Sequence, residues 1–169
     1  DEMSSRGLGD VYKRQVQFVS LKPYKIRVSG RIKHFISAFG EHVIGAEVMS
    51  AMATLTEHSE VEVREFTVAP QVNPPEGGLP YHEWFVDFEK APKDLVQFAK
   101  DLDKIMCEKN IYYKDLIDGS ILQNLKITPL QDFAFRKYMD SIGKLGGQNK
   151  IPRLSNDRNI ADKFEAFKL

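Results

Sequence analysis

The chain has 169 residues, enough for one domain or one domain with a piece of another. Hydrophobic residues make up 42% of it and charged residues 28%, with 24 Lys and Arg against 24 Asp and Glu. This zero net charge gives no electrostatic footprint for nucleic acid or for an anionic membrane. No apolar run approaches the roughly 20 residues of a membrane span. The single cysteine, Cys107, excludes an internal disulfide framework and a site of several thiolates, which fits a reducing cytoplasm.

The first fifteen residues look foreign to the protein. The stretch "SRGLGDVYKRQ" (residues 5–15) resembles the translation of a transposase-type sequencing-library adaptor. We therefore expect residues 1–15 to be a sequencing artefact, and exclude them from the prediction of the fold. The native sequence would then begin in the middle of a domain at Val16, so we expect the chain to be the C-terminal part of a longer protein.

Two short alternating runs, residues 16–20 and 24–30, predict two strands joined by a turn. Residues 46–58 follow, and helical spacing places four apolar side chains on one face: Val48, Met49, Met52 and Leu55. Next come a β-branched run at 61–70 and the run "YHEWFVDFE" at 81–89, separated by a loop rich in Gly and Pro. They predict an antiparallel hairpin with a long loop.

The second half of the chain continues with a helical pattern in residues 92–110. Its apolar positions have helical spacing: Leu95, Phe98, Leu102, Ile105 and Met106. A third strand is predicted within residues 122–130, a short helix before Gly143, and a terminal helix from about Asn156. From Ala46 onward this order predicts an α+β fold, with a small three-stranded antiparallel sheet and helices packed on one side. The two strands before residue 31 would lie outside that unit.

The run "GKLGGQNKIPRLSNDR" (residues 143–158) is the first candidate site. It does not match the Walker phosphate-loop pattern, and no predicted strand runs into it. Its glycines would let backbone amides approach a ligand, and Lys150 and Arg153 could neutralise a phosphate or a developing anion. The alternative is a surface loop with solvated charges, which composition alone favours.

A second candidate is "SGRIKHF", where Gly30 and Arg31 join the two N-terminal strands to the rest of the chain. It could be a hinge, because glycine permits a large backbone change, or simply a strand pair with a turn. On the run at 81–89, Trp84, Val86 and Phe88 share one face and are predicted to be core. Glu83 and Asp87 lie on the opposite face. The four histidines lack ligand spacing, so no metal site is predicted.

Four motifs in order carry a resemblance to a known family: "GRIKHFISAFGEHVIG", "EFTVAP…LPYHEWFVDFE", "NIYYKDLIDG" and "GKLGGQNKIPRLSNDR". Over about residues 16–169 the chain resembles the C-terminal part of the Gretchen Hagen 3 (auxin-responsive promoter) acyl acid–amido synthetases, most closely the bacterial members. That family belongs to the adenylate-forming superfamily with acyl-CoA synthetases, luciferases and peptide-synthetase adenylation domains.

The resemblance implies a two-step reaction that uses ATP and Mg²⁺. A carboxylic acid first attacks the α-phosphate of ATP, which gives an acyl-adenylate and pyrophosphate. An amine, typically an amino acid, then attacks this mixed anhydride and expels AMP. A large N-terminal domain holds most of the ATP, Mg²⁺ and acid sites, and a small C-terminal domain rotates about a hinge between the two steps. Residues 16–30 would be the last strands of that N-terminal domain, and residues 31–169 the mobile C-terminal domain.

The resemblance also assigns roles to individual residues. Gly30, Arg31 and Lys33 match the hinge, and Lys150 matches the catalytic lysine that contacts the ATP phosphates and the acyl carboxylate. The same match predicts nucleotide or phosphate contacts from a set of residues beside these: Arg31, Gly146, Gly147, Gln148 and Arg153. No metal ligand is expected in this chain.

Because the N-terminal domain would be missing, we expect this chain alone to be inactive. The parent is expected to be a cytoplasmic monomer that binds a small carboxylic acid and an amine, with neither nucleic acid nor membrane as partner. Two alternatives stay open. The chain could come from an acyl-CoA ligase, with a thiol as acceptor, or it could be a non-catalytic α+β binding module.

Overall fold

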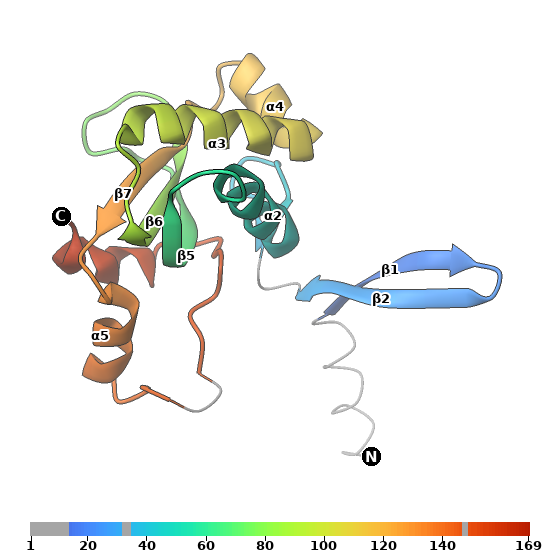
Figure 1. Cartoon of the computed structure of the whole chain (residues 1–169). Coiled ribbons are helices and arrows are strands. Elements are labelled where there is room, and N and C mark those ends of the chain that lie inside the picture. Colours follow the sequence, from blue (N-terminus) through green and yellow to red (C-terminus); the bar gives the residue numbers. More distant parts are fainter. Residues whose placement is uncertain (1–13, 32–34, 147–148) are drawn as a thin grey trace, which may run out of the picture.

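The computed structural model describes residues 14–31, 35–146 and 149–169. Strands β1 (Arg14–Leu21) and β2 (Tyr24–Arg31) form an antiparallel hairpin that projects from the rest of the chain (Figure 1). The predicted pair of strands is therefore confirmed. Strand β1 includes Arg14 and Gln15, the last two residues of the segment with the adaptor-like sequence. Whether the hairpin belongs to a preceding domain stays a prediction.

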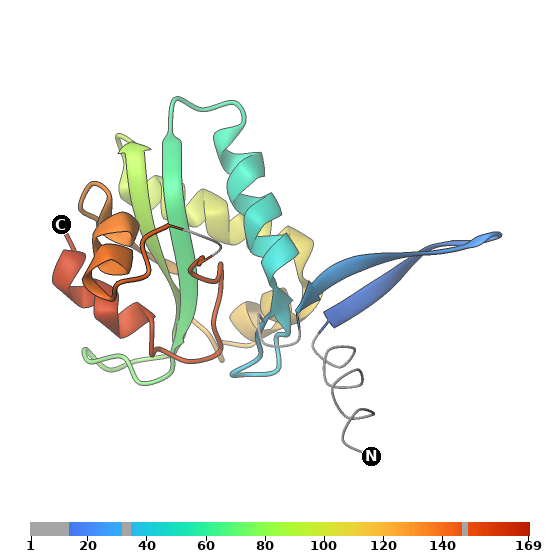
Figure 2. The same ribbon diagram turned by 90° about the horizontal axis from the view of Figure 1, so that it is seen from below.

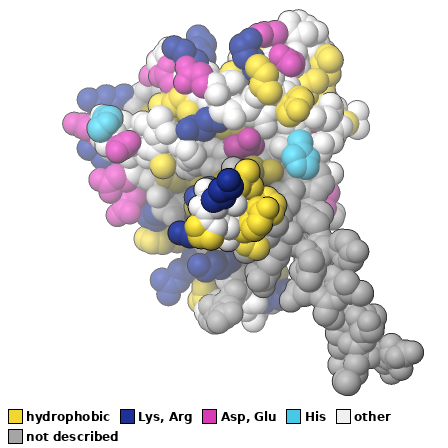
Figure 3. All heavy atoms as spheres, turned by 90° about the vertical axis from the view of Figure 1, so that its right-hand side faces the viewer, with side chains coloured by type: hydrophobic (Ala, Val, Ile, Leu, Met, Phe, Trp, Pro, Cys, Tyr) yellow, Lys and Arg dark blue, Asp and Glu magenta, His cyan; other side chains and the backbone are white. Residues whose placement is uncertain are grey.

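The projecting hairpin carries large apolar side chains that are more than half exposed: Phe18, Val19, Leu21, Tyr24 and Ile26. Figure 3 looks toward the tip of this hairpin, where hydrophobic side chains gather beside Lys and Arg. The hairpin thus contrasts with the rest of the chain, where most large apolar side chains are packed.

A short connection leads from the hairpin into the main body. Strands β3 (Phe35–Ile36) and β4 (Val43–Ile44) pair antiparallel around a turn in which Gly40 has a φ of +95°. Helix α2 (Gly45–Thr56) follows, and the Glu47 carboxylate accepts a hydrogen bond from the Ile44 amide at 2.9 Å, which caps its first turn.

The predicted helical face of α2 is confirmed in part. Val48 and Met52 are buried and Leu55 packs against the same core. Met49, which was predicted on this face, is exposed, and Ala51 takes its place in the core.

The central sheet has three strands in the order β5-β6-β7: β5 (Glu62–Gln71), β6 (Tyr81–Lys90) and β7 (Lys126–Leu130). Strands β5 and β6 form the predicted long-looped antiparallel hairpin. Strand β7 pairs parallel to β6, so the expected all-antiparallel sheet is wrong. The reason is the connection, since helices α3 (Leu95–Lys109) and α4 (Ile111–Asp118) carry the chain back before β7 begins.

One face of this sheet packs against α2 and α3 (Figure 2). The main core here contains Trp84, Val86 and Phe88, as predicted, and Trp84 stacks on Phe66 with ring centroids 5.4 Å apart. Helix α3 contributes the predicted apolar positions: Phe98, Leu102 and Met106 are buried, and Leu95 and Ile105 are partly buried.

The prediction of helices on one side only is wrong, because α5 (Ala134–Ser141) and the 3₁₀ helix η1 (Ala161–Phe167) cover the opposite face. The expected terminal helix is therefore a 3₁₀ helix that begins later than Asn156. Phe85 points into this second core and lies 6.2 Å from the ring of Phe164. All of residues 81–88 are buried, so β6 needs a layer on both sides. Among the described helices, none is long and apolar enough to cross a membrane.

Truncating the main core should destabilise this chain strongly. Leu102 is fully buried on α3, so we expect Leu102→Ala to lower the free energy of unfolding by about 2–5 kcal/mol. Val96 lies on the same helix and is 67% exposed, so Val96→Ala should change it by less than about 0.5 kcal/mol. Urea unfolding followed by circular dichroism measures both. Equal effects of the two substitutions would contradict the packing described here.

Candidate functional site

The loop between α5 and η1 contains the candidate lysine. Helix α5 ends at Ser141, and Gly143 then adopts a φ of +66° while the Lys144 amide donates to the Met139 carbonyl at 2.9 Å. This confirms Gly143 as the helix stop. Gly146 also has a positive φ, +89°, which favours glycine there. Gly147 and Gln148, two of the predicted phosphate-contacting residues, lie outside the described residues.

Lys150 is exposed, and the chain immediately after it is fastened to the edge of the sheet. The Thr67 hydroxyl donates to the Pro152 carbonyl at 2.8 Å. The Val68 amide then donates to the Arg153 carbonyl and the Ser155 amide to the Val68 carbonyl, each at 2.9 Å. These bonds form a parallel bridge between Val68 and the fully buried Leu154. Lys150 therefore lies two residues from an anchored backbone.

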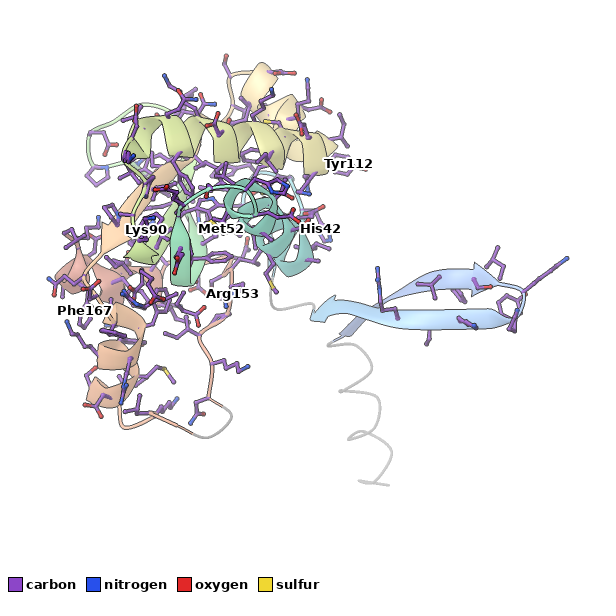
Figure 4. The ribbon with its side chains drawn as sticks, viewed as in Figure 1. His42, Met52, Lys90, Tyr112, Arg153 and Phe167 are labelled. Carbon is purple, nitrogen blue, oxygen red and sulfur yellow. The ribbon has the colours of Figure 1, made fainter. Side chains whose placement is uncertain are left out.

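Arg153, the second predicted phosphate ligand, contacts the sheet (Figure 4). Its Nη1 donates to the Phe66 carbonyl at 3.0 Å and pairs with Glu65, while the guanidinium lies 4.8 Å from the centroid of the Phe66 ring. Burial lowers the pKa of Arg153. Its role on a phosphate stays a prediction, and these contacts give it a second role in holding the loop to β5.

The other end of the same loop is held by a charge network on the second face of the sheet. Arg158 pairs with the buried Glu83 at 2.9 Å and with Asp162 at 2.9 Å. Burial opposes a charged guanidinium, but Glu83 and Asp162 outweigh it and raise the pKa of Arg158. Glu83 also accepts from the Thr128 hydroxyl at 2.5 Å and lies 3.5 Å from the Lys168 amine.

A similar arrangement satisfies the second buried carboxylate of β6. Arg64 Nη1 lies 2.9 Å from Asp87, 3.0 Å from Asp132, and 2.7 Å from the Phe88 carbonyl. Burial raises the pKa of Asp87 and Arg64 opposes this shift. Sequence reasoning did not identify Arg64 and Arg158. The sequence feature that could have indicated these two partners is the alternation on β6, where Glu83 and Asp87 flank Phe85 on a strand buried on both faces.

Of the predicted hinge residues, Gly30 and Arg31 end strand β2, where Gly30 pairs with Gln15 and Arg31 with Arg14. Lys33 lies outside the described residues. Shortly after this position, the Ser37 amide donates to Asn156 Oδ1 at 2.9 Å, across 119 positions of sequence. The structure therefore brings the segment after the predicted hinge into direct contact with the loop that carries Lys150.

The segment after the predicted hinge is also fixed to β6 by a buried hydrogen bond. Glu41 and His82 are both almost fully buried, and Glu41 Oε1 lies 2.9 Å from His82 Nε2. Burial opposes ionisation of Glu41, but His82 and the Phe39 amide outweigh it and hold the pKa of this carboxyl below its usual value. The His82 ring also packs 5.1 Å from that of Tyr113.

The surroundings of the Cys107 thiol indicate a role in packing. Cys107 packs against the main core, and burial raises the pKa of its thiol to about 11, which is unfavourable for a nucleophile. No three or more His, Cys, Asp or Glu side chains within residues 14–31, 35–146 and 149–169 lie together as metal ligands would. In the described part of the loop, Lys150 and Gly146 are exposed, so both are accessible to an anion.

The fold and loop together define an α+β domain, and comparison with known proteins identifies its family. The sequence model of the GH3 family C-terminal domain matches residues 46–159, from α2 to the loop beyond Lys150. This chain therefore belongs to the GH3 family. A comparison with curated proteins gives no match.

Solved structures support the same fold. The chain is similar to a GH3.15 acyl acid amido synthetase with a TM-score of 0.70 and 14% sequence identity. A second structure, AtGH3.15 acyl acid amido synthetase in complex with 2,4-DB, gives a TM-score of 0.67 and 15% identity. Each alignment covers 93% of this chain but only 31% and 30% of those proteins. The chain thus spans about a third of the length of these relatives.

Removing the buried carboxylate should reveal its contribution to stability. We expect Glu41→Gln to lower the free energy of unfolding at pH 7 by about 1–3 kcal/mol, because a charged hydrogen bond to His82 is lost. A lowered pKa in the folded state stabilises the fold above the pKa of the unfolded chain, and this contribution disappears as the pH falls through the folded value.

Urea unfolding between pH 3 and pH 7 measures this dependence. The variant should lose less stability than the wild type on acidification below about pH 4.5. The exposed Glu57 supplies a matched control, and Glu57→Gln should follow the wild-type curve. A Glu41→Gln curve parallel to that of the wild type would show that the carboxylate does not titrate as described.

Proposed function

We propose that this chain is the C-terminal part of an ATP-dependent acyl acid–amido synthetase. The parent would activate a carboxylic acid as an acyl-adenylate, with release of pyrophosphate, and transfer the acyl group to an amine such as an amino acid. The observation that carries this proposal is the match of the GH3 C-terminal domain over residues 46–159, which include the Lys150 loop. Similarity in fold to acyl acid amido synthetases supports it.

Lys150 is the proposed catalytic residue of this part of the protein. As the carboxylate approaches the α-phosphate of ATP, two negatively charged groups meet, and a nearby ammonium would lower the energy of that arrangement. The exposed position of Lys150 leaves its side chain accessible to a substrate. Its neighbours from Pro152 onward are hydrogen-bonded to β5, which limits the number of places the lysine can occupy.

ATP, Mg²⁺, the acid and the amine would bind mainly to the rest of the parent, because this chain spans about a third of the length of its structural relatives. In this proposal Gly30, Arg31 and Lys33 form the hinge, and residues 31–169 swing Lys150 toward the nucleotide. Gly146, Gly147 and Gln148 would offer backbone or amide contacts to its phosphates. The chain alone would be inactive, and the parent a cytoplasmic monomer.

ATP–pyrophosphate exchange by the full-length parent, assayed with a panel of carboxylic acids, tests this function. At least one acid should stimulate exchange, and Lys150→Ala should lower its rate by about 100- to 1,000-fold, as removal of a single charge-stabilising group does. Lys144 is an exposed lysine of the same loop, so Lys144→Ala should stay within about twofold of the wild type.

The outcomes separate the parts of the proposal. Absence of exchange with every acid would contradict the activity, and equal effects of the two lysine substitutions would contradict the role of Lys150. Supplying either amino acids or coenzyme A to the loaded enzyme then distinguishes an amido synthetase from an acyl-CoA ligase, since only the accepted nucleophile releases AMP.

A further inference from the structure

The hydrogen bond between Ser37 and Asn156 joins two segments that the proposed mechanism uses separately. Ser37 lies six residues after Arg31, and Asn156 lies six residues after Lys150. The Ser37 amide donates to Asn156 Oδ1 at 2.9 Å. The bond is therefore a direct connection between the chain that leaves the hinge and the chain that leaves the lysine.

The Ser37 side of this connection is rigidly attached to the body of the domain. Ile36, its neighbour, is fully buried in the main core, as is Val43 on the paired strand β4. The buried Glu41 in the same turn holds His82 on β6. A rotation that begins at Gly30 and Arg31 must consequently move residues 35–44 together with the sheet.

The Lys150 side is attached less completely. The loop is fixed at Pro152, Arg153 and Leu154 on the edge of β5 and at Arg158 on Glu83. Asn156 lies between these two anchors and is exposed. In the described part of the loop before Ile151, the Asn149 side chain donates a long hydrogen bond of 3.5 Å to the Gly146 carbonyl. The anchors at residues 152–154 therefore hold the chain that directly follows Lys150.

We propose that Asn156 is a positioning residue that couples the segment after the hinge to the lysine loop, so that Lys150 moves with the hinge as part of one body. The inference rests on the proposed function. It is based on one hydrogen bond: Asn156 Oδ1 accepts from the Ser37 amide and so connects the two anchored segments. Loss of one such bond widens the range of loop positions and lowers the fraction in which Lys150 reaches the reacting carboxylate.

The first test uses ATP–pyrophosphate exchange by the full-length parent. Asn156→Ala removes the acceptor and should lower the exchange rate about 3- to 10-fold, the range expected for one hydrogen bond. Asn156→Asp keeps an oxygen acceptor and should restore most of the rate. Asn159→Ala, on an exposed asparagine nearby, serves as the control and should leave the rate unchanged.

A double substitution separates positioning from a general structural effect. If Asn156 acts through the lysine, Asn156→Ala should cost nothing further once Lys150 is already alanine. If the exchange rate of the double variant falls by the product of the two single-variant factors, the proposal is overturned. A wild-type exchange rate for Asn156→Ala, in an enzyme that Lys150→Ala disables, would also overturn it. An enzyme unaffected by Lys150→Ala would instead refute the proposed catalytic role.

Amide hydrogen exchange of this chain tests the coupling without activity. In Asn156→Ala, peptides covering residues 36–44 and 149–155 should both exchange faster, while those from α3 keep their wild-type protection. Faster exchange of the lysine loop alone, with residues 36–44 unchanged, would show that the two segments are not coupled through Asn156. Asn159→Ala should leave both segments at wild-type rates.

Discussion

Eight consecutive residues of β6, residues 81–88, are buried, and the two faces of this strand need different kinds of packing partner. Trp84, Val86 and Phe88 need an apolar layer, which α2 and α3 provide. Glu83 and Asp87 point the other way, and buried carboxylates are unfavourable unless they are paired. Arg158 and Arg64 supply those pairs. Because Arg158 follows the Lys150 loop, the burial of Glu83 also fixes one end of the candidate site.

Local patterns in the sequence predicted the helices and strands well. They did not predict the features that depend on residues far apart in the sequence. The β-branched run of β5, the alternation in β6 and the helical spacing in α3 each specify their own conformation. The direction of β7 does not depend on its residues, because the crossover through α3 and α4 determines it. The layer formed by α5 and η1 was missed because the second face of β6 carries Glu83 and Asp87, whose arginine partners are 75 and 23 positions away in sequence.

The candidate site, too, could be predicted only in part from local sequence. The glycines and Lys150 could be selected from the sequence because their residue types suit an anion. The anchors could not, since Thr67 on β5 and Ser37 beyond the hinge have no sequence signature that points to Pro152 or Asn156. Arg153 illustrates the limit of residue type alone: its charge suggested a phosphate ligand, and its guanidinium contacts Glu65 and the Phe66 carbonyl. A charged loop residue can thus serve the fold as well as a ligand.

We propose that this domain carries Lys150 to the site where a carboxylic acid meets ATP, and that the lysine acts in that step alone. Single-turnover kinetics of the full-length parent test it most directly, by comparing acyl-adenylate formation with amine transfer from an adenylate supplied ready-made. The account predicts that Lys150→Ala slows adenylate formation by about 100-fold or more while transfer stays within a few fold of the wild type. Equal losses in both steps would contradict it.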